Sequence, residues 1–344
     1  FLEDVGKKLT DASRQEMVDA IRAASGRVII GETVAFKQSM IDGVSNTELL
    51  KSWGCDMVTI NHYNVDFPMV PGINSTPEGI RQFGKVFKEA VASAIKRANY
   101  EPLFGKELAS YKVTSSELKG ACFYLVSGHG GPDPGAIGRI GKIELHEDEY
   151  AYDIVLRLAR NLMTKGAKVH IIIQDAKDGI RDAKYLKNSK RETCMGSPIP
   201  FNQVRRLKQR SDKINTLFKQ DKYAYKRAIF VHVDSRNKGH QTDVFFYHQN
   251  KNSESKHLAK TMRTTFTHKY KKHQPGRGFT GTVDGRNLYV LRHTTPASVF
   301  VELGNIQNSF DQQRIILSDN RQALANWLCE GFVTDYNRYK KKTR

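Results

Sequence analysis

Cysteine is scarce in this sequence and long apolar runs are missing, and each absence excludes a class of protein. The four cysteines of the 344 residues form no CxxC pair and no dense framework, which excludes a disulfide-built scaffold. We predict that Cys55, Cys122, Cys194 and Cys329 are free, buried or half-buried thiols. No apolar run reaches the roughly 18 residues of a membrane-spanning helix, so no transmembrane segment is expected. The chain begins at Phe1, and no signal peptide is visible.

Acidic residues are scarce in most of the chain. Residues 1–80 hold 7 Lys/Arg against 11 Asp/Glu, whereas residues 81–344 hold 48 against 25, a net charge of +23. Such a surface suits a polymer with anionic groups, and nucleic acid, teichoic acid or an acidic glycan would each fit. A generally solvated basic face is the ordinary alternative.

The first 80 residues follow a strand–helix–strand pattern. Apolar runs at 27–36 and 56–65 predict strands, and the segment 44–54 between them predicts a helix. The stretch GETVAFKQSMIDGVSNTELLKSWGCDMVTIN resembles the opening βαβ of a TIM-barrel-like family of uncharacterised proteins. A complete barrel needs about 200 residues or more, so we assign residues 1–80 no catalytic role. A helical connector over 81–120 is predicted to follow.

From residue 121 to 338, strands alternate with helices, and several strands are continuously apolar. This pattern predicts an α/β domain with a central mostly parallel or mixed sheet and helices on both faces. The predicted strands cover 121–128, 168–175, 227–234, 242–249, 287–293 and 297–304. The predicted helices cover 147–166, 203–220, 254–267 and 319–337; a polar loop covers 176–202 and a basic tail 339–344.

Four polar residues of this domain occupy positions that packing does not explain. His129 follows an apolar strand in the glycine-rich turn GHGGPDPGAIG, and Glu147 begins the long helix. His232 and Glu302 each interrupt an apolar strand. Taken singly, His232 reads as a satisfied core histidine, Glu147 as a partner of the helix dipole, and Glu302 as a buried ion-pair partner.

Taken together, two histidines and a carboxylate with a further glutamate are the usual composition of a hydrolytic zinc site. Three protein ligands hold the metal, and the fourth position is left to water. The remaining glutamate takes the proton of that water and later returns it to the leaving amine.

These residues resemble the zinc-dependent N-acetylmuramoyl-L-alanine amidases of the type-3 amidase family over about residues 121–338. The motifs that carry the resemblance are GHGGPDPGAIG, EDEYAYDIVLRLARNLMTKG, RAIFVHVD and PASVFVELGNIQN. The resemblance implies that zinc is bound by His129, Glu147 and His232 and that Glu302 is the catalytic carboxylate. It also implies hydrolysis of the amide between N-acetylmuramic acid and L-alanine of the peptidoglycan stem peptide.

Some positions depart from the family or stay open. Asp234 stands where the family usually has Asn, and the 176–202 loop looks longer than its usual connector. Glu149 competes with Glu147 for the ligand role, although residues two apart on a helix face different ways. Asp133 supports either the turn or a ligand, and the sequence does not place His293.

The main hypothesis is therefore a zinc amidase that acts on peptidoglycan in the cell envelope, periplasmic or secreted, with anionic wall polymers as further binding partners. The alternative is an inactive module with the amidase fold that binds the wall or activates a partner. A nucleic-acid-binding protein is a third reading, based on the Lys/Arg-rich stretches 181–191 and 204–213. No nucleic-acid-binding motif is found, so no nucleic-acid partner is expected.

Overall fold

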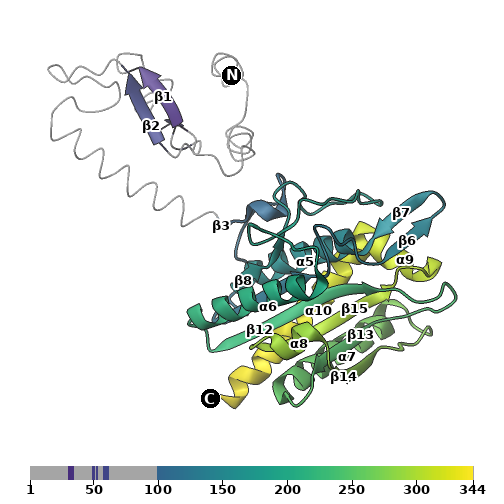
Figure 1. Cartoon of the computed structure of the whole chain (residues 1–344). Coiled ribbons are helices and arrows are strands. Elements are labelled where there is room, and N and C mark those ends of the chain that lie inside the picture. Colours follow the sequence, from purple (N-terminus) through teal and green to yellow (C-terminus); the bar gives the residue numbers. More distant parts are fainter. Residues whose placement is uncertain (1–29, 35–48, 51, 53–56, 62–98, 344) are drawn as a thin grey trace. The chain divides into compact units, whose positions relative to one another are not determined.

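The computed structural model of the chain describes residues 30–34, 49–50, 52, 57–61 and 99–343 (Figure 1). The chain divides into two compact units, Phe1–Pro102 and Leu103–Arg344. Residues 81–98 of the predicted helical connector lie outside the described residues. The boundaries predicted at residues 80 and 120 stay predictions.

The first unit contains two paired strands. β1 (Ile30–Val34) and β2 (Met57–Asn61) run parallel, with Ile30 opposite Met57. Both lie within the apolar runs predicted to be strands, and their parallel pairing is that of a βαβ unit. The short strand β3 (Asn99–Tyr100) and the 3₁₀ helix η1 (Pro102–Phe104) lead into the second unit.

The second unit is built on a six-stranded sheet in the order β14-β13-β15-β12-β5-β8. Four of its five strand pairings are parallel, and only the β13–β15 pairing is antiparallel. This confirms the predicted fold class. The strands are β5 (Ala121–Ser127), β8 (Lys168–Ile171), β12 (Tyr225–Asp234), β13 (Phe245–Gln249), β14 (Thr282–Arg286) and β15 (Ala297–Asn305).

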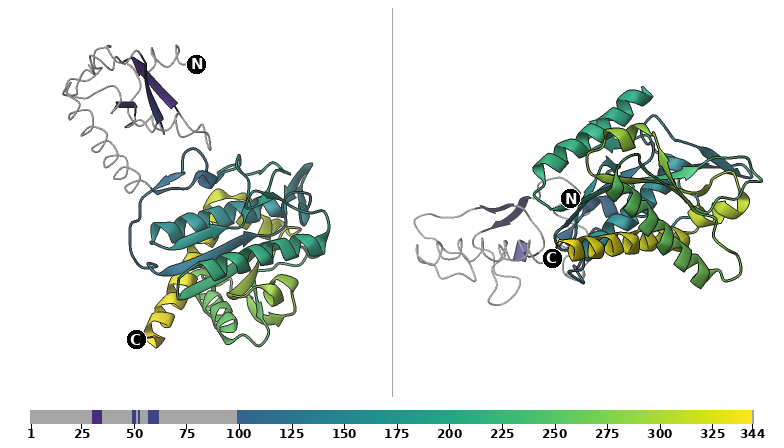
Figure 2. Two further views of the ribbon diagram at one scale, coloured as in Figure 1. Left: turned by 60° about the vertical axis from the view of Figure 1, so that its left-hand side comes forward. Right: turned by 90° about the horizontal axis from the view of Figure 1, so that it is seen from below.

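Helices cover both faces of this sheet (Figures 1 and 2). One face packs against α5 (Glu147–Thr164), α7 (Ser253–His273) and α10 (Ser318–Lys342). The other packs against α6 (Gln203–Gln220) and α8 (Tyr289–His293). Because both faces are covered, strands such as β5 are buried at every position, which explains their unbroken apolar sequence.

Smaller elements surround the carboxyl ends of the strands. A hairpin of β6 (Ile137–Ile140) and β7 (Ile143–His146) leads into α5, and α9 (Ser309–Ile316) precedes α10. The other short strands are β4 (Ser110–Tyr111), β9 (Ile173–Gln174), β10 (Thr193–Cys194) and β11 (Ser197–Pro198). The last three form a small sheet of their own.

One strand prediction is wrong. The apolar run at 287–293 forms the helix α8 rather than a strand, and the edge strand β14 precedes it. A short apolar run does not distinguish a strand from one helical turn. Here Val290 and Leu291 are buried against the sheet face that α6 covers. The edge strand is mostly polar and exposed, so it gave no apolar signal.

The carboxyl end of the chain also differs from the prediction. The last helix continues to Lys342, so the basic residues placed in a tail after it form its final turn. Lysines in that position interact favourably with the helix dipole. The helix α9 was missed, although the Asn308 side chain caps it by accepting the N–H groups of Phe310 and Asp311.

Candidate metal centre

A glycine-rich turn at the carboxyl end of β5 positions the first histidine. His129 has a backbone φ of 58°, and Gly130, Gly131 and Gly135 also have positive φ values. A Cβ atom at Gly128 would lie 2.4 Å from the His232 ring, and one at Gly135 would lie 2.6 Å from Glu147 Oε2. Glycine is therefore required at both positions, because any side chain would displace the groups that face the turn.

Three predicted ligand residues converge at this turn. His129, Glu147 and His232 each offer a donor atom, and these atoms lie within 4.8 Å of one another. Glu147 Oε2 lies 3.2 Å from His129 Nε2, and Glu147 Oε1 lies 2.9 Å from His232 Nδ1. The elements that carry them are the turn after β5, the first residue of α5, and β12.

Backbone donors and an aromatic ring hold these side chains in place. The N–H of Ala136 donates to Glu147 Oε2 at 2.9 Å, and the N–H of Val233 donates to Oε1 at 3.1 Å. The His232 ring stacks on Phe300 with a centroid distance of 4.2 Å. The carboxylate is thus fixed between two imidazoles, the donor set that zinc prefers.

The charges of the three groups follow from this packing. Burial alone would raise the pKa of Glu147, but hydrogen bonds with the two histidines hold it well below its usual range. Burial lowers the pKa of His232, which keeps its ring neutral and able to bind a metal. Burial alone would lower the pKa of His129, but hydrogen bonds with Asp133 and Glu147 raise it to about 10.

Glu302 lies beside His232 on the neighbouring parallel strand, in direct register. Its Oε2 atom is buried and has no hydrogen-bond partner. Burial, then the charges of Glu147 and Asp234, raise the pKa of Glu302 well above its usual value. An unpaired buried carboxyl beside three metal donors is a strong mark of a functional site.

A second layer of side chains orients His129; it includes Asp133, considered above as a support of the turn or of a ligand, and two arginines that the sequence did not indicate. Its Nδ1–H donates to Asp133 Oδ2 at 2.8 Å, and Arg206 forms an ion pair with the same oxygen. Arg210, which is buried, donates to the main-chain oxygen of His129 at 2.9 Å. Arg206 and Arg210 are four residues apart and so lie on one face of α6. This spacing is the sequence feature that could have indicated their shared role.

The 176–202 loop packs against the turn. Glu192 in this loop accepts the N–H of Gly131 at 2.8 Å. Glu149 faces the loop and not the histidines, because its carboxylate pairs with Arg181 and accepts the N–H of Ser189. The sequence offered both Glu147 and Glu149 for one candidate ligand position, and the structure places Glu149 away from it.

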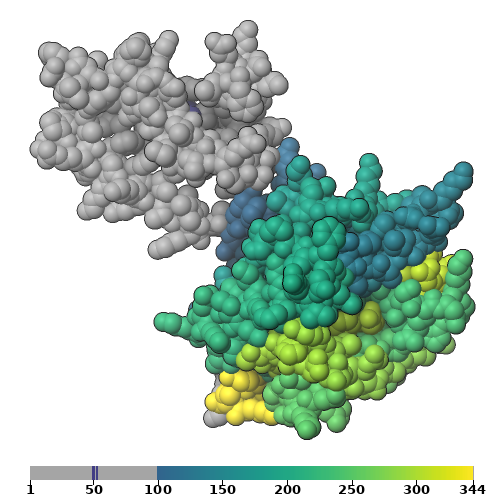
Figure 3. Space-filling view, viewed as in Figure 1, coloured from purple at the N-terminus to yellow at the C-terminus, as the bar shows by residue number. Residues whose placement is uncertain are grey.

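The β6–β7 hairpin projects beside the same turn (Figure 3). It connects the turn to Glu147, and Ile137 and Ile143 on it are 37% and 41% exposed. The side chain of Gln307 donates to the main-chain oxygen of Ile137 at 2.8 Å, which ties the hairpin to the segment after β15. Two apolar side chains of the hairpin are therefore partly exposed to solvent.

The other residues singled out in the sequence pair or stack with neighbours in the fold. Asp234 forms an ion pair with Arg236. His293 ends α8, and its ring stacks on Tyr289. The basic stretches 181–191 and 204–213 include arginines that pair within the fold, namely Arg181, Arg191 and Arg206.

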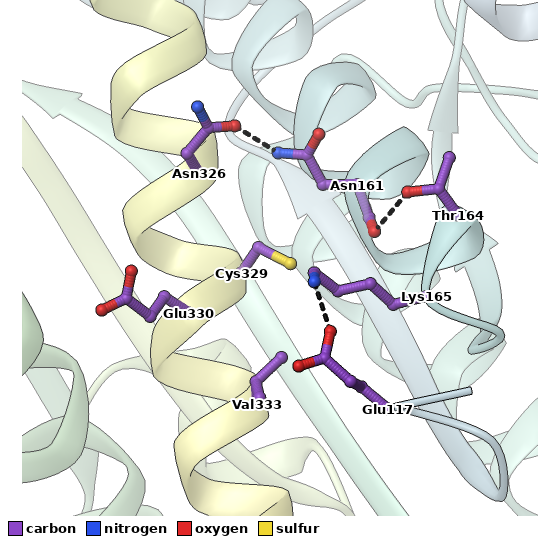
Figure 4. Close-up of a pocket in the computed structure, with 8 residues that line it drawn as sticks. All are labelled: Glu117, Asn161, Thr164, Lys165, Asn326, Cys329, Glu330 and Val333. Carbon is purple, nitrogen blue, oxygen red and sulfur yellow. Dashed lines mark hydrogen bonds and ion pairs between the residues drawn. The ribbon is translucent and has the colours of Figure 1, made fainter. Parts of the chain in front are cut away.

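A surface cavity of about 380 Å³ lies between α5 and α10, apart from the histidines (Figure 4). Asn161, Lys165 and Cys329 line it, together with Glu117, which pairs with Lys165. At about 1.5 Å per helical residue, Asn161 lies on the order of 20 Å from Glu147 along α5. This cavity is therefore separate from the candidate metal centre.

An α/β sheet whose strand ends gather two imidazoles and a carboxylate is suited to metal-dependent hydrolysis. The chain belongs to the N-acetylmuramoyl-L-alanine amidase family, whose model matches residues 124–333. This confirms the resemblance inferred over 121–338. A second model, a domain of unknown function (DUF7916), matches residues 2–114.

Individual relatives agree with this family. An uncharacterized cell wall amidase of Bacillus anthracis is 25% identical over 251 residues, which are 71% of this chain and 40% of that protein. The chain thus spans less than half of that relative.

Two solved structures are similar in part. The CwlD amidase of Clostridioides difficile, solved in complex with the GerS lipoprotein, has a TM-score of 0.48 and 16% identity over 63% of this chain and 98% of its own. The amidase AmiC2 of Nostoc punctiforme has a TM-score of 0.46 and 17% identity over 64% of this chain and 99% of its own. Within the described residues, no helix combines the length and apolar character of a membrane span.

Proposed function

We propose that the chain hydrolyses the amide between the lactyl group of N-acetylmuramic acid and L-alanine of the stem peptide, with zinc held by His129, Glu147 and His232. The observation that carries the proposal is the convergence of these three donors within 4.8 Å, with the unpartnered Oε2 of Glu302 on the adjoining strand. A zinc ion bound there supplies Lewis-acid chemistry, because it lowers the pKa of water and polarises a carbonyl.

The chain's own residues divide the remaining work. Glu302 accepts a proton from the attacking water, whose oxygen bonds to the carbonyl carbon. As the carbon–nitrogen bond breaks, Glu302 returns that proton to the departing amine of L-alanine. The products are a lactyl carboxylate and a free stem peptide. The positive charge of a divalent ion nearby opposes the rise in the pKa of Glu302 and keeps its carboxylate available.

The surroundings of the centre fit a polymeric substrate. Residues 81–344 carry a net charge of +23, which suits anionic wall polymers as secondary partners. The projecting hairpin offers exposed isoleucines beside the centre. Because peptidoglycan lies outside the cytoplasm, we infer a periplasmic or secreted protein.

The test is digestion of purified sacculi followed by analysis of the soluble products. The expected result is release of free stem peptides with an amino-terminal L-alanine, lost on chelation and restored by zinc. Glu302→Gln should retain zinc and lose activity by about 10²–10⁴-fold. Glu330→Gln is a matched control, because that side chain is 51% exposed on α10 and pairs with Lys269.

The outcomes separate the readings. Full activity of Glu302→Gln would refute the role of this residue. Sacculus binding without peptide release by the zinc-loaded chain would favour the inactive wall-binding module.

A further inference from the structure

A second cluster of donor atoms lies on the face of the sheet that α6 covers, away from the amidase centre. It consists of Cys122 on β5, His170 on β8 and Asp221, the residue that caps the end of α6. One donor atom of each lies within 4.8 Å of the other two. Cys122 precedes His129 by seven residues along β5, which at about 3.3 Å per residue is on the order of 20 Å.

The distances within this cluster match a tetrahedral metal site. Zinc bonds of about 2.0–2.3 Å at tetrahedral angles separate neighbouring donors by about 3.3–3.8 Å. Cys122 Sγ lies 3.6 Å from Asp221 Oδ2, and His170 Nε2 lies 3.0 Å from the same oxygen and 3.2 Å from Asp221 Oδ1. The three donors therefore need little movement to share one ion.

The surroundings hold the three side chains in this arrangement. Tyr124 and His170 are opposite each other on the paired strands, and their rings stack with a centroid distance of 5.4 Å. The hydroxyl of Tyr124 donates to Asp221 Oδ2 at 2.8 Å. Lys226 donates to the main-chain oxygens of Phe218 and Asp221, which fixes the end of α6. A partner that orients a ligand from outside is typical of metal sites.

We propose that Cys122, His170 and Asp221 form a second divalent-metal site of the zinc class, separate from the amidase centre. A thiolate, an imidazole and a carboxylate together select zinc over the hard cations magnesium and calcium. The thiolate and the carboxylate balance the two charges of the ion, so the occupied cluster is neutral. The side chains of His170 and Asp221 are each 12% exposed, which leaves a path for the ion.

The charges around this cluster both favour and oppose a bound cation. Burial, and then the charge of Asp221, raise the pKa of the Cys122 thiol to about 12. A divalent ion reverses this effect, because coordination deprotonates a thiol. Two nearby cations oppose metal binding, Lys168 beside Cys122 and His170 and Lys226 at the main-chain oxygen of Asp221. The carboxyl end of α6 adds a negative dipole that favours a cation.

Cobalt substitution tests this site directly, because only one of the two centres contains a thiolate. The reduced, demetallated full chain is titrated with Co²⁺, and the near-ultraviolet thiolate-to-cobalt charge-transfer band is recorded with the bound metal. The expected result is two bound ions and a charge-transfer band. Cys122→Ser and His170→Gln should each lower the stoichiometry to one, and Cys122→Ser should abolish the band.

Two controls keep this inference distinct from the proposed amidase centre. Cys194→Ser removes another buried thiol and should keep the band. The double variant His129→Ala/His232→Ala should lose one ion and also keep the band. The test of the second site can therefore be interpreted even if the amidase centre binds no metal. Absence of the band in the wild-type chain, or its persistence in Cys122→Ser, would overturn the second site.

Discussion

The substitution Asp133→Asn tests how far the layer behind His129 determines metal binding. The carboxylate of Asp133 accepts the Nδ1–H of His129 at 2.8 Å, pairs with Arg206, and accepts the N–H of Gly135 at 3.2 Å. Asparagine keeps the size and one acceptor oxygen but removes the charge. It therefore weakens the hydrogen bond that points His129 Nε2 towards Glu147 and makes that nitrogen a poorer donor.

The expected magnitude follows from this geometry. Loss of a carboxylate behind a histidine ligand weakens metal affinity by about 10–100-fold, which corresponds to about 1.4–2.8 kcal/mol. Zinc affinity is measured by competition with a chromophoric chelator, on protein whose thermal unfolding shows that it is folded. Because the chain offers a second candidate zinc site, the measurement is made in the Cys122→Ser background.

A matched control is available on the same helix as Arg206. Asp212→Asn removes an exposed carboxylate that pairs with Lys208 and should leave zinc affinity unchanged. A change below about twofold for Asp133→Asn would refute the reasoning, because the carboxylate would then have no part in orienting His129.

Three further predictions concern the turn, the loop and the buried ion pairs. Gly135→Ala should abolish zinc binding at the amidase centre, because its Cβ would lie 2.6 Å from Glu147 Oε2. Metal analysis of the purified variant would show this loss. Asp175→Asn should lower the melting temperature at pH 7, and it should lower it less at a pH well below 3.8. Burial alone would raise the pKa of Asp175, but hydrogen bonds from Ser189 and two backbone N–H groups lower it below 3.8. The stabilising contribution of this carboxylate is therefore present above pH 3.8 and is lost as the pH falls through the folded-state pKa. Arg321→Leu should cost about 3–5 kcal/mol in denaturant unfolding, because it leaves the fully buried Asp153 without this partner.

Each of these predictions has its own control or contrary result. Gly141→Ala imposes a similar backbone strain at φ 59° but meets nothing within 4 Å, so it should retain zinc. An equal loss of melting temperature for Asp175→Asn at both pH values would contradict the charge argument. A cost below about 1 kcal/mol for Arg321→Leu would show that the pair with Asp153 contributes little.

Much of the fold was predictable because its strands are buried on both faces. The strands β5, β12 and β15 each contain a mostly apolar run, and a covered parallel sheet requires such runs. The helix α5 has a clear apolar stripe and ends before Gly166, whose φ is 85°. The helix α8 was not predictable, because five residues carry too little periodicity.

The sequence indicated the residues that converge at the candidate site and one of their supports, Asp133, but not Arg206 and Arg210. His129, Glu147, His232 and Glu302 stand out because polar side chains in apolar strands and glycine turns require a reason. Their roles stay proposals. The link from α6 to His129 depends on which helix face meets the turn, and that depends on tertiary packing. Charge patterning along the chain does not encode it.

The central claim is tested most directly by a crystal structure of the zinc-loaded chain with anomalous diffraction at the zinc absorption edge. The account predicts an anomalous peak at about 2.0–2.2 Å from one atom each of His129, Glu147 and His232. Glu302 should lie beside the open coordination position. A peak bonded to other residues only, or ligand side chains too far apart to share one ion, would contradict the account.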